Sequence, residues 1–149
     1  MLPRARRQEA RGIPWAWKGG LAMSENRGNK RILLVDDSET VLMLERMILK
    51  GGSYELAMAK DGKEAVAKAL ALRPDLILMD VIMPKMNGFD AIRELRRRPE
   101  TRSIPILIVT TKGEEESMET GYLSGCNDYI TKPIDSLELL TKIRSFLGT

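Results

Sequence analysis

The stretch Arg31–Glu39 reads RILLVDDSE, an apolar run that ends in two adjacent acidic residues. Residues 32–35 are all apolar, as in strands of a parallel sheet that is covered on both faces. Asp36 and Asp37 follow at once, although adjacent carboxylates repel each other and burial raises their pKa values. The pair therefore indicates that something cationic binds at the end of this strand.

The composition is that of a globular domain of ordinary size. The chain has 149 residues, of which 43% are hydrophobic and 30% charged, and no run is long and apolar enough to span a membrane. Cys126 is the only cysteine and histidine is absent, which excludes an internal disulfide and removes the usual zinc ligand and general base. We therefore expect a cytoplasmic protein with no membrane association.

The positive charge of the chain is concentrated near its N-terminus. The net charge is +3, but residues 1–22 contain five basic residues and one acidic residue, which leaves −1 for the rest of the chain. The charge of the folded part therefore gives no reason to expect a nucleic-acid partner.

Residues 1–29 are expected to form a basic leader, either disordered or, before Met23, upstream of the natural start. Prolines and glycines interrupt any helix there, and the segment lacks the apolar core of a signal peptide. Trp15 and Trp17 leave a basic–aromatic anchor for membrane or nucleic acid as the alternative. The folded domain is expected over residues 30–149.

Five short apolar segments alternate with amphipathic segments after the leader. The segments predicted as strands are residues 31–35, 54–59, 75–79, 104–109 and 128–131. Between them, apolar residues recur three or four positions apart, as in amphipathic helices. Strict alternation with short connections predicts an α/β fold, in which helices cover both faces of a parallel sheet.

The predicted helices also carry signals for their faces and ends. Their apolar stripes are Val41, Leu44 and Ile48; Ala65, Ala69 and Leu72; Phe89, Ile92 and Leu95; and Leu140, Ile143 and Leu147. Asp61 and Asp135 each precede a glutamate by three positions, as in a capping box. Gly51 and Gly52 are expected to end the first helix in the left-handed conformation. The fourth helix, roughly Glu114–Ser124, is poorly amphipathic.

Polar side chains follow four of the five predicted strands. They are Asp36 and Asp37, then Asp80, then Thr110 and Thr111, and finally Thr131 and Lys132. The ligand crevice of an open α/β sheet lies beyond the carboxyl ends of its strands, so these side chains are expected at one edge. Proteins hold Mg²⁺ with one or two carboxylates, a phosphate and water. The set therefore predicts a magnesium site that handles phosphate.

The charges of this expected site nearly cancel. The three aspartates carry −3, while Mg²⁺ and Lys132 supply +3. Asp36 and Asp37 can both reach the site only if the strand breaks at Val35, because successive strand residues point to opposite faces. Phosphorylation would replace one charge of −1 by about −2. The surplus charge would then attract a donor such as the Thr110 hydroxyl.

Four blocks of sequence lie on these strand ends in a recognisable order. They are ILLVDDSE (residues 32–39), PDLILMDVIMPKMNGFD (74–90), IPILIVTTKG (104–113) and DYITKPID (128–135). They resemble the signature blocks of the receiver domain of bacterial two-component response regulators, over about residues 30–148. The resemblance implies a flavodoxin-like (βα)5 three-layer sandwich, with a parallel five-stranded sheet in the order 2-1-3-4-5.

The resemblance also implies the metal site and the phosphoacceptor. Asp80 would accept the phosphoryl group, and Mg²⁺, or Mn²⁺, would be the cofactor. Asp37 would bind the metal directly and Asp36 mainly through metal-bound water. Ile82 would contribute its backbone carbonyl, although its side chain is apolar where many members of the family carry a polar residue.

The remaining residues of the site would bind and report the phosphate. By the same resemblance, Lys132 would pair with a phosphate oxygen, and the Lys132–Pro133 peptide bond is expected to be cis. Thr110, with Thr111 beside it, would be the hydroxyl switch, and Tyr129 the aromatic switch. The signal would reach a surface formed by the fourth helix, fifth strand and fifth helix.

The predicted function is that of a single-domain response regulator, not an enzyme. A sensor histidine kinase or phosphotransfer protein would supply the phosphoryl group, and a downstream protein would dock on the altered surface. A truncated receiver of a longer regulator is the alternative. A Mg²⁺-dependent aspartyl phosphatase would want a second Asp where Ile82 stands, and a flavin carrier would want a phosphate-cradling loop where Asp36 and Asp37 lie.

Overall fold

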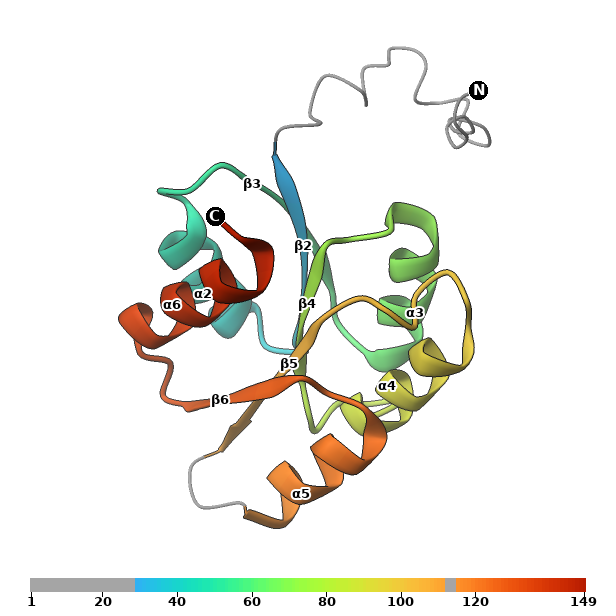
Figure 1. Ribbon diagram of the computed structural model, residues 1–149. Coiled ribbons are helices and arrows are strands. Elements are labelled where there is room, and N and C mark those ends of the chain that lie inside the picture. Colours follow the sequence, from blue (N-terminus) through green and yellow to red (C-terminus); the bar gives the residue numbers. More distant parts are fainter. Residues whose placement is uncertain (1–28, 112–114) are drawn as a thin grey trace, which may run out of the picture.

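The computed structural model of the chain describes residues 29–111 and 115–149 (Figure 1). Strands and helices alternate throughout these residues, as predicted. The elements are β2 (Lys30–Val35), α2 (Glu39–Leu49), β3 (Tyr54–Ala59), α3 (Gly62–Leu72), β4 (Leu76–Asp80), α4 (Gly88–Arg97), β5 (Ile106–Thr111), α5 (Glu115–Ser124), β6 (Asp128–Lys132) and α6 (Ser136–Leu147). Almost all of the expected leader lies outside the described residues.

The strands form one parallel sheet in the order β3-β2-β4-β5-β6. Counted along the chain, this is the expected order 2-1-3-4-5. In Figure 1, α2 and α6 lie on one face of the sheet, and α3, α4 and α5 lie on the other. The three-layer flavodoxin-like sandwich is therefore confirmed. None of the helices within the described ranges combines the length and apolar character needed to cross a membrane.

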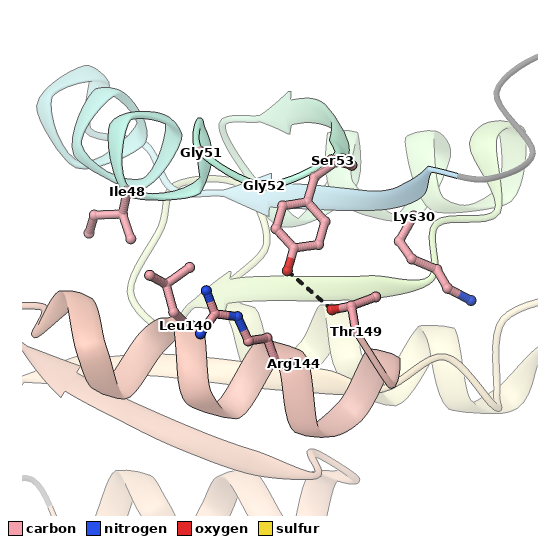
Figure 2. A pocket seen from close by; sticks show the side chains of 9 residues that line it. Lys30, Ile48, Gly51, Gly52, Ser53, Leu140, Arg144 and Thr149 are labelled. Atoms are coloured by element: carbon pink, nitrogen blue, oxygen red, sulfur yellow. Dashed lines mark hydrogen bonds between the residues drawn. The ribbon is translucent and has the colours of Figure 1, made fainter.

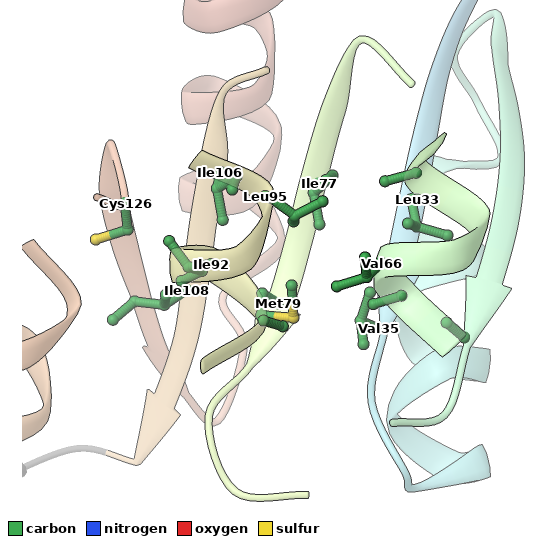
Figure 3. Close-up of a cluster of buried hydrophobic side chains, with 14 of the residues drawn as sticks. Leu33, Val35, Val66, Ile77, Met79, Ile92, Leu95, Ile106, Ile108 and Cys126 are labelled. Atoms are coloured by element: carbon green, nitrogen blue, oxygen red, sulfur yellow. The ribbon is translucent and has the colours of Figure 1, made fainter. Parts of the chain in front are cut away.

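The central strands are apolar on both sides because each side faces a layer of helices. In β4, Leu76 and Leu78 belong to the cluster under α2 and α6, while Ile77 and Met79 belong to the cluster under α3 and α4. Figure 3 shows the second cluster. Fully burying one such side chain contributes about 1.5–3 kcal/mol. The strand that ends in Asp80 is thus firmly anchored on both faces.

Side-chain caps decide where several helices begin. Ser38 caps α2, and Asp135 accepts hydrogen bonds from two backbone N–H groups at the start of α6. Asp61 caps α3 by accepting from Glu64 N at 2.8 Å. The Glu64 carboxylate, however, accepts from Lys60 N at 2.8 Å, one residue before the position that completes a capping box.

The predicted apolar stripe of α2 is wrong by one position. The buried residues of α2 are Leu42, Glu45 and Leu49, whereas Leu44 is 41% exposed. Both sets have helical spacing, and the set that contains Glu45 was the less apolar choice. A carboxyl group therefore lies on the buried face of this helix.

The predicted left-handed end of α2 is also wrong. The helix ends at Lys50 in the right-handed conformation, and the glycines with positive φ in the described residues are Gly125 and Gly148. Gly52 has another function, since a Cβ there would collide with the ring of Tyr54. Its small size allows the chain to turn tightly into β3.

Candidate functional site

Three carboxylates converge at the carboxyl ends of β2 and β4. Asp36, Asp37 and Asp80 each place a carboxylate oxygen within 4.8 Å of the others. Asp36 is 1% exposed and Asp80 7% exposed, while Asp37 is exposed. Carboxylates this close together require nearby positive charge, and oxygen donors at this spacing suit a hard divalent cation.

The end of β2 at Val35 allows both adjacent aspartates to reach the site, as the sequence required. Asp36 N still donates to Ala59 O of β3 at 3.0 Å, which holds this residue against the sheet. The Asp36 carboxylate then accepts from Ser38 N at 2.9 Å. This turn leaves Asp37 as the exposed member of the three carboxylates, and α2 starts immediately afterwards.

Lys132 joins the site from the last strand of the sheet. Its Nζ donates to Asp36 Oδ2 at 3.3 Å and to Asp80 Oδ1 at 3.2 Å. Burial lowers the pKa of Lys132, but attraction by Asp80 and Asp36 outweighs burial and raises it overall. The ammonium group therefore remains charged and partly neutralises the two buried carboxylates. The bond between Lys132 and Pro133 is cis.

Asp80 has an unusually high pKa for an aspartate. Burial and repulsion by Asp36 raise it to about 6, against the opposing attraction of Lys132. The carboxyl group is nevertheless mostly ionised at neutral pH. A divalent cation in the site would favour the ionised form further.

The loop after β4 is shaped by backbone hydrogen bonds. Gly88 N donates to Val81 O at 2.8 Å and Met86 N to Pro84 O at 2.7 Å, while Lys85 adopts a positive φ of 69°. Ile82 projects from this loop and is 71% exposed. Coordination by its carbonyl oxygen stays a prediction.

The two threonines at the end of β5 differ in exposure. Thr110 is 2% exposed and lies in register with Thr131 of β6, whereas Thr111 is exposed and lies in register with Lys132. Because β5 lies between β4 and β6, Thr110 is next to the strand that carries the phosphoacceptor candidate. The buried threonine is therefore better placed than Thr111 to respond to a change inside the site.

Tyr129 of the edge strand β6 contacts one helix from each face of the sheet. Its half-buried ring meets the ring of Tyr122 edge-on, with centroids 6.4 Å apart and an interplanar angle of 89°. Lys142 Nζ of α6 lies 4.9 Å from the ring centroid and donates to Tyr129 O at 2.6 Å. The ring thus contacts both α5 and α6.

The sequence did not single out Glu45 as part of this neighbourhood. Burial raises the pKa of Glu45 to about 8, and the charges of Asp36, Lys132 and Asp80 also act on it. The signal available in the sequence was its spacing, since Glu45 lies three residues after Leu42 and four before Leu49 and so shares their helix face.

A separate pocket lies at the opposite end of β2, near Lys30 (Figure 2). It is lined by Lys30, Ile48, Gly51, Gly52, Ser53, Tyr54, Leu140, Arg144 and Thr149. Tyr54 Oη and Thr149 Oγ1 are 3.3 Å apart across it. Because the carboxylates lie at the other end of the strands, this pocket is separate from the candidate site.

The sheet order and the acidic edge together define the class of protein. Residues 32–144 match the response regulator receiver domain family, and the chain belongs to this family. Protein PilH of Pseudomonas aeruginosa is 42% identical over 118 residues, which cover 79% of this chain and 98% of PilH. The DNA-binding regulator RpaA of Synechocystis is 38% identical, but the match covers only 48% of its length.

A solved structure with the same fold contains a magnesium ion. It is the receiver domain of a sensor histidine kinase from Pseudomonas aeruginosa, with a magnesium ion coordinated in its active-site cleft. Its identity to this chain is 31% and its TM-score 0.76, and the match covers 81% of this chain and 99% of that domain.

Proposed function

We propose that this chain is a phosphorylation-controlled switch, in which Asp80 accepts a phosphoryl group from a sensor histidine kinase or a phosphotransfer protein. The observation that carries this proposal is the convergence of three carboxylates and one ammonium group on a single edge of the sheet. Membership of the receiver family supports it. The transfer is proposed to take place in the cytoplasm, and residues 1–29 to precede the receiver without contributing to it.

Mg²⁺ or Mn²⁺ would be held by the carboxylates of Asp36, Asp37 and Asp80, together with the carbonyl of Ile82. The close oxygens of two buried and one exposed aspartate fit such a cation. When bound, the cation neutralises the carboxylates and the incoming phosphoryl oxygens. Asp37 is the exposed member of the three and would be the ligand most accessible to a cation from solvent.

Phosphoryl transfer needs an ionised oxygen on Asp80. A new O–P bond forms there while the P–N bond of the donor's phosphohistidine breaks, and the electron pair stays on the imidazole nitrogen, which takes up a proton. Because Lys132 Nζ already lies 3.2 Å from Asp80 Oδ1, it can pair with a phosphoryl oxygen after little movement. Positioning and charge neutralisation are the main requirements of this reaction.

Thr110 and Tyr129 would report the phosphorylated state. The added negative charge draws the buried Thr110 hydroxyl toward Asp80, and the space that this vacates admits the Tyr129 ring. Because that ring contacts Tyr122 of α5 and Lys142 of α6, its rotation would rearrange both helices.

The surface that changes would be formed by α5, β6 and α6. It presents three large apolar side chains to solvent, since Tyr122 is 48% exposed, Leu123 82% and Leu137 71%. Large apolar side chains exposed on the elements of the proposed switch are consistent with docking of a protein partner. We propose that a downstream protein docks on this surface.

Intact-mass analysis after incubation with phosphoramidate and Mg²⁺ tests the proposal. The parent protein should gain one phosphoryl group and Asp80→Asn none, because a small donor needs only an in-line carboxylate and neutralised charge. Asp75→Asn is a matched control, because Asp75 directly precedes β4 and so lies at the end of this strand opposite to Asp80. Undiminished labelling of Asp80→Asn would exclude the proposed phosphoacceptor.

An aspartyl phosphatase would need a second acid two residues after Asp80. That position is Ile82, whose side chain points to solvent and cannot transfer a proton. The switch is therefore the better supported function.

A further inference from the structure

Glu45 is a buried carboxyl group that the proposed reaction does not use. It is 1% exposed and lies on the α2 face of Leu42 and Leu49. Its Oε1 has no hydrogen-bond partner among the residues that the structure describes. Burying an acceptor without a partner is unfavourable, so an apolar side chain would stabilise this position better. Packing alone does not account for the glutamate.

The charged groups around Glu45 are those of the candidate site. Asp36 at the end of β2, Asp80 at the end of β4 and Lys132 at the end of β6 all act on its carboxyl. From α6 and β3, which also contact α2, the side chains in the surrounding core are Leu139, Leu140, Ile143, Tyr54, Leu56 and Met58. The charges of the site therefore act on the buried Glu45 carboxyl across a largely apolar core, in which charges are poorly screened.

We propose that Glu45 is a fourth carboxyl group of the acidic site, a positioning residue that acts on Lys132 and on the bound cation from the protein interior. This inference rests on the proposed metal site. A negative charge on Glu45 attracts both cationic groups, whereas the neutral acid does not. Cation binding and ionisation of Glu45 therefore favour each other. Phosphorylation of Asp80 adds negative charge and favours the neutral acid.

Magnesium titrations of three proteins at two pH values test the inference, without a phosphate donor. The proteins are the parent, Glu45→Gln, which keeps the shape but removes the charge, and Glu45→Leu, which also removes the buried polar atoms. At pH 6 all three should bind Mg²⁺ within about twofold, because Glu45 is then neutral. At pH 9 both variants should bind about tenfold more weakly than the parent.

Stability distinguishes this electrostatic effect from a structural one. Glu45→Leu should be the most stable of the three, because it removes an unpaired buried acceptor, and yet bind Mg²⁺ as weakly as Glu45→Gln at pH 9. Glu94→Gln removes a carboxylate from α4, on the other face of the sheet, and should leave Mg²⁺ affinity unchanged at both pH values.

Two outcomes would overturn the inference, and they differ in what else they affect. Equal Mg²⁺ affinity of the parent and Glu45→Gln at pH 9 removes Glu45 from the site and leaves the proposed function intact. Absence of Mg²⁺ binding by the parent at both pH values contradicts the proposed metal site, and the inference fails with it. If Glu45→Leu does not fold, the Mg²⁺ affinities of the parent and Glu45→Gln at pH 9 test the inference on their own.

Discussion

The backbone of Gly88, the first residue of α4, lies directly against the carbonyl group of Asp80. A Cβ on Gly88 would collide with that carbonyl oxygen and would come within 3.1 Å of Met79 Cγ. Gly88 N also donates to Val81 O at 2.8 Å. The start of this helix is therefore fixed against the residue that carries the proposed phosphoacceptor.

Gly88→Ala should lower the free energy of unfolding by about 1–3 kcal/mol, because the added methyl group forces the backbone of Asp80 to move. Labelling of Asp80 by phosphoramidate should slow in the same variant. Gly51→Ala is the control, since a Cβ there meets no described atom within 4 Å, and its stability should change by less than about 0.5 kcal/mol. Urea unfolding measures the stability of the two variants. Equal losses of stability in Gly88→Ala and Gly51→Ala would contradict the steric argument.

Ionisation of Asp80 should make the metal-free protein less stable as the pH rises from about 4 to about 6. Burial, together with repulsion by Asp36, raises the pKa of Asp80 from 3.8 to about 6, so the folded state binds this proton more tightly than the unfolded state. Protonation of Asp80 therefore stabilises the folded state by on the order of 2–3 kcal/mol. This contribution is complete below pH 4 and is lost as the pH rises through 6.

Urea unfolding in chelator at pH 4, 5 and 7 checks this pH dependence. Asp80→Asn should reduce the loss of stability between these values, because its side chain does not ionise. An excess of Mg²⁺ should also reduce it by favouring the ionised carboxylates. A parent and an Asp80→Asn variant with identical slopes would show that Asp80 is not the titrating group.

Asp36→Ala and Asp37→Ala should separate metal binding from stability. If Asp37 is the direct ligand, we expect Asp37→Ala to weaken Mg²⁺ binding at least about tenfold, and more than Asp36→Ala does. Asp36→Ala should cost more stability, because Asp36 accepts from Ser38 N and from Lys132 Nζ. Calorimetric titration and thermal unfolding provide the two measurements. Equal Mg²⁺ affinities would count against the direct role of Asp37.

Thr110→Ala should leave phosphorylation of Asp80 largely intact and uncouple it from α6. A switch moves between two existing states, and the phosphate can bias it only through a differential interaction with them. Amide chemical shifts of residues 128–147, with and without beryllofluoride as a phosphoryl mimic, measure the coupling. The parent should show shifts that Thr110→Ala lacks. Identical shifts in both would assign the coupling to another residue.

The elements that could be predicted from the sequence are those with the most regular signals. The strands ending at Val35 and Asp80 are nearly continuous apolar runs, and their carboxyl ends must meet in a parallel sheet. That constraint alone brought Asp36, Asp80 and Lys132 together before any distance was known.

The features that sequence missed depend on tertiary contacts. The α2 stripe was assigned one position early, because Val41, Leu44 and Ile48 are more apolar than the set that contains Glu45. Arg96 is another case, since its guanidinium donates to the carbonyls of Gly125, Arg102 and Ile104 at 2.8–3.0 Å. Nothing in a basic helix end predicts which distant carbonyls it will meet.

The contact between Asp36 and Lys132 joins residues 96 positions apart, one directly after β2 and the other at the end of β6, the first and last described strands in chain order. During synthesis, the acidic residues therefore leave the ribosome long before the ammonium group that neutralises them. An unfinished or C-terminally clipped chain should present the proposed phosphoacceptor without its cationic partner and should be labelled poorly by a phosphoryl donor. The ability to accept a phosphoryl group would then depend on synthesis and folding of the whole domain.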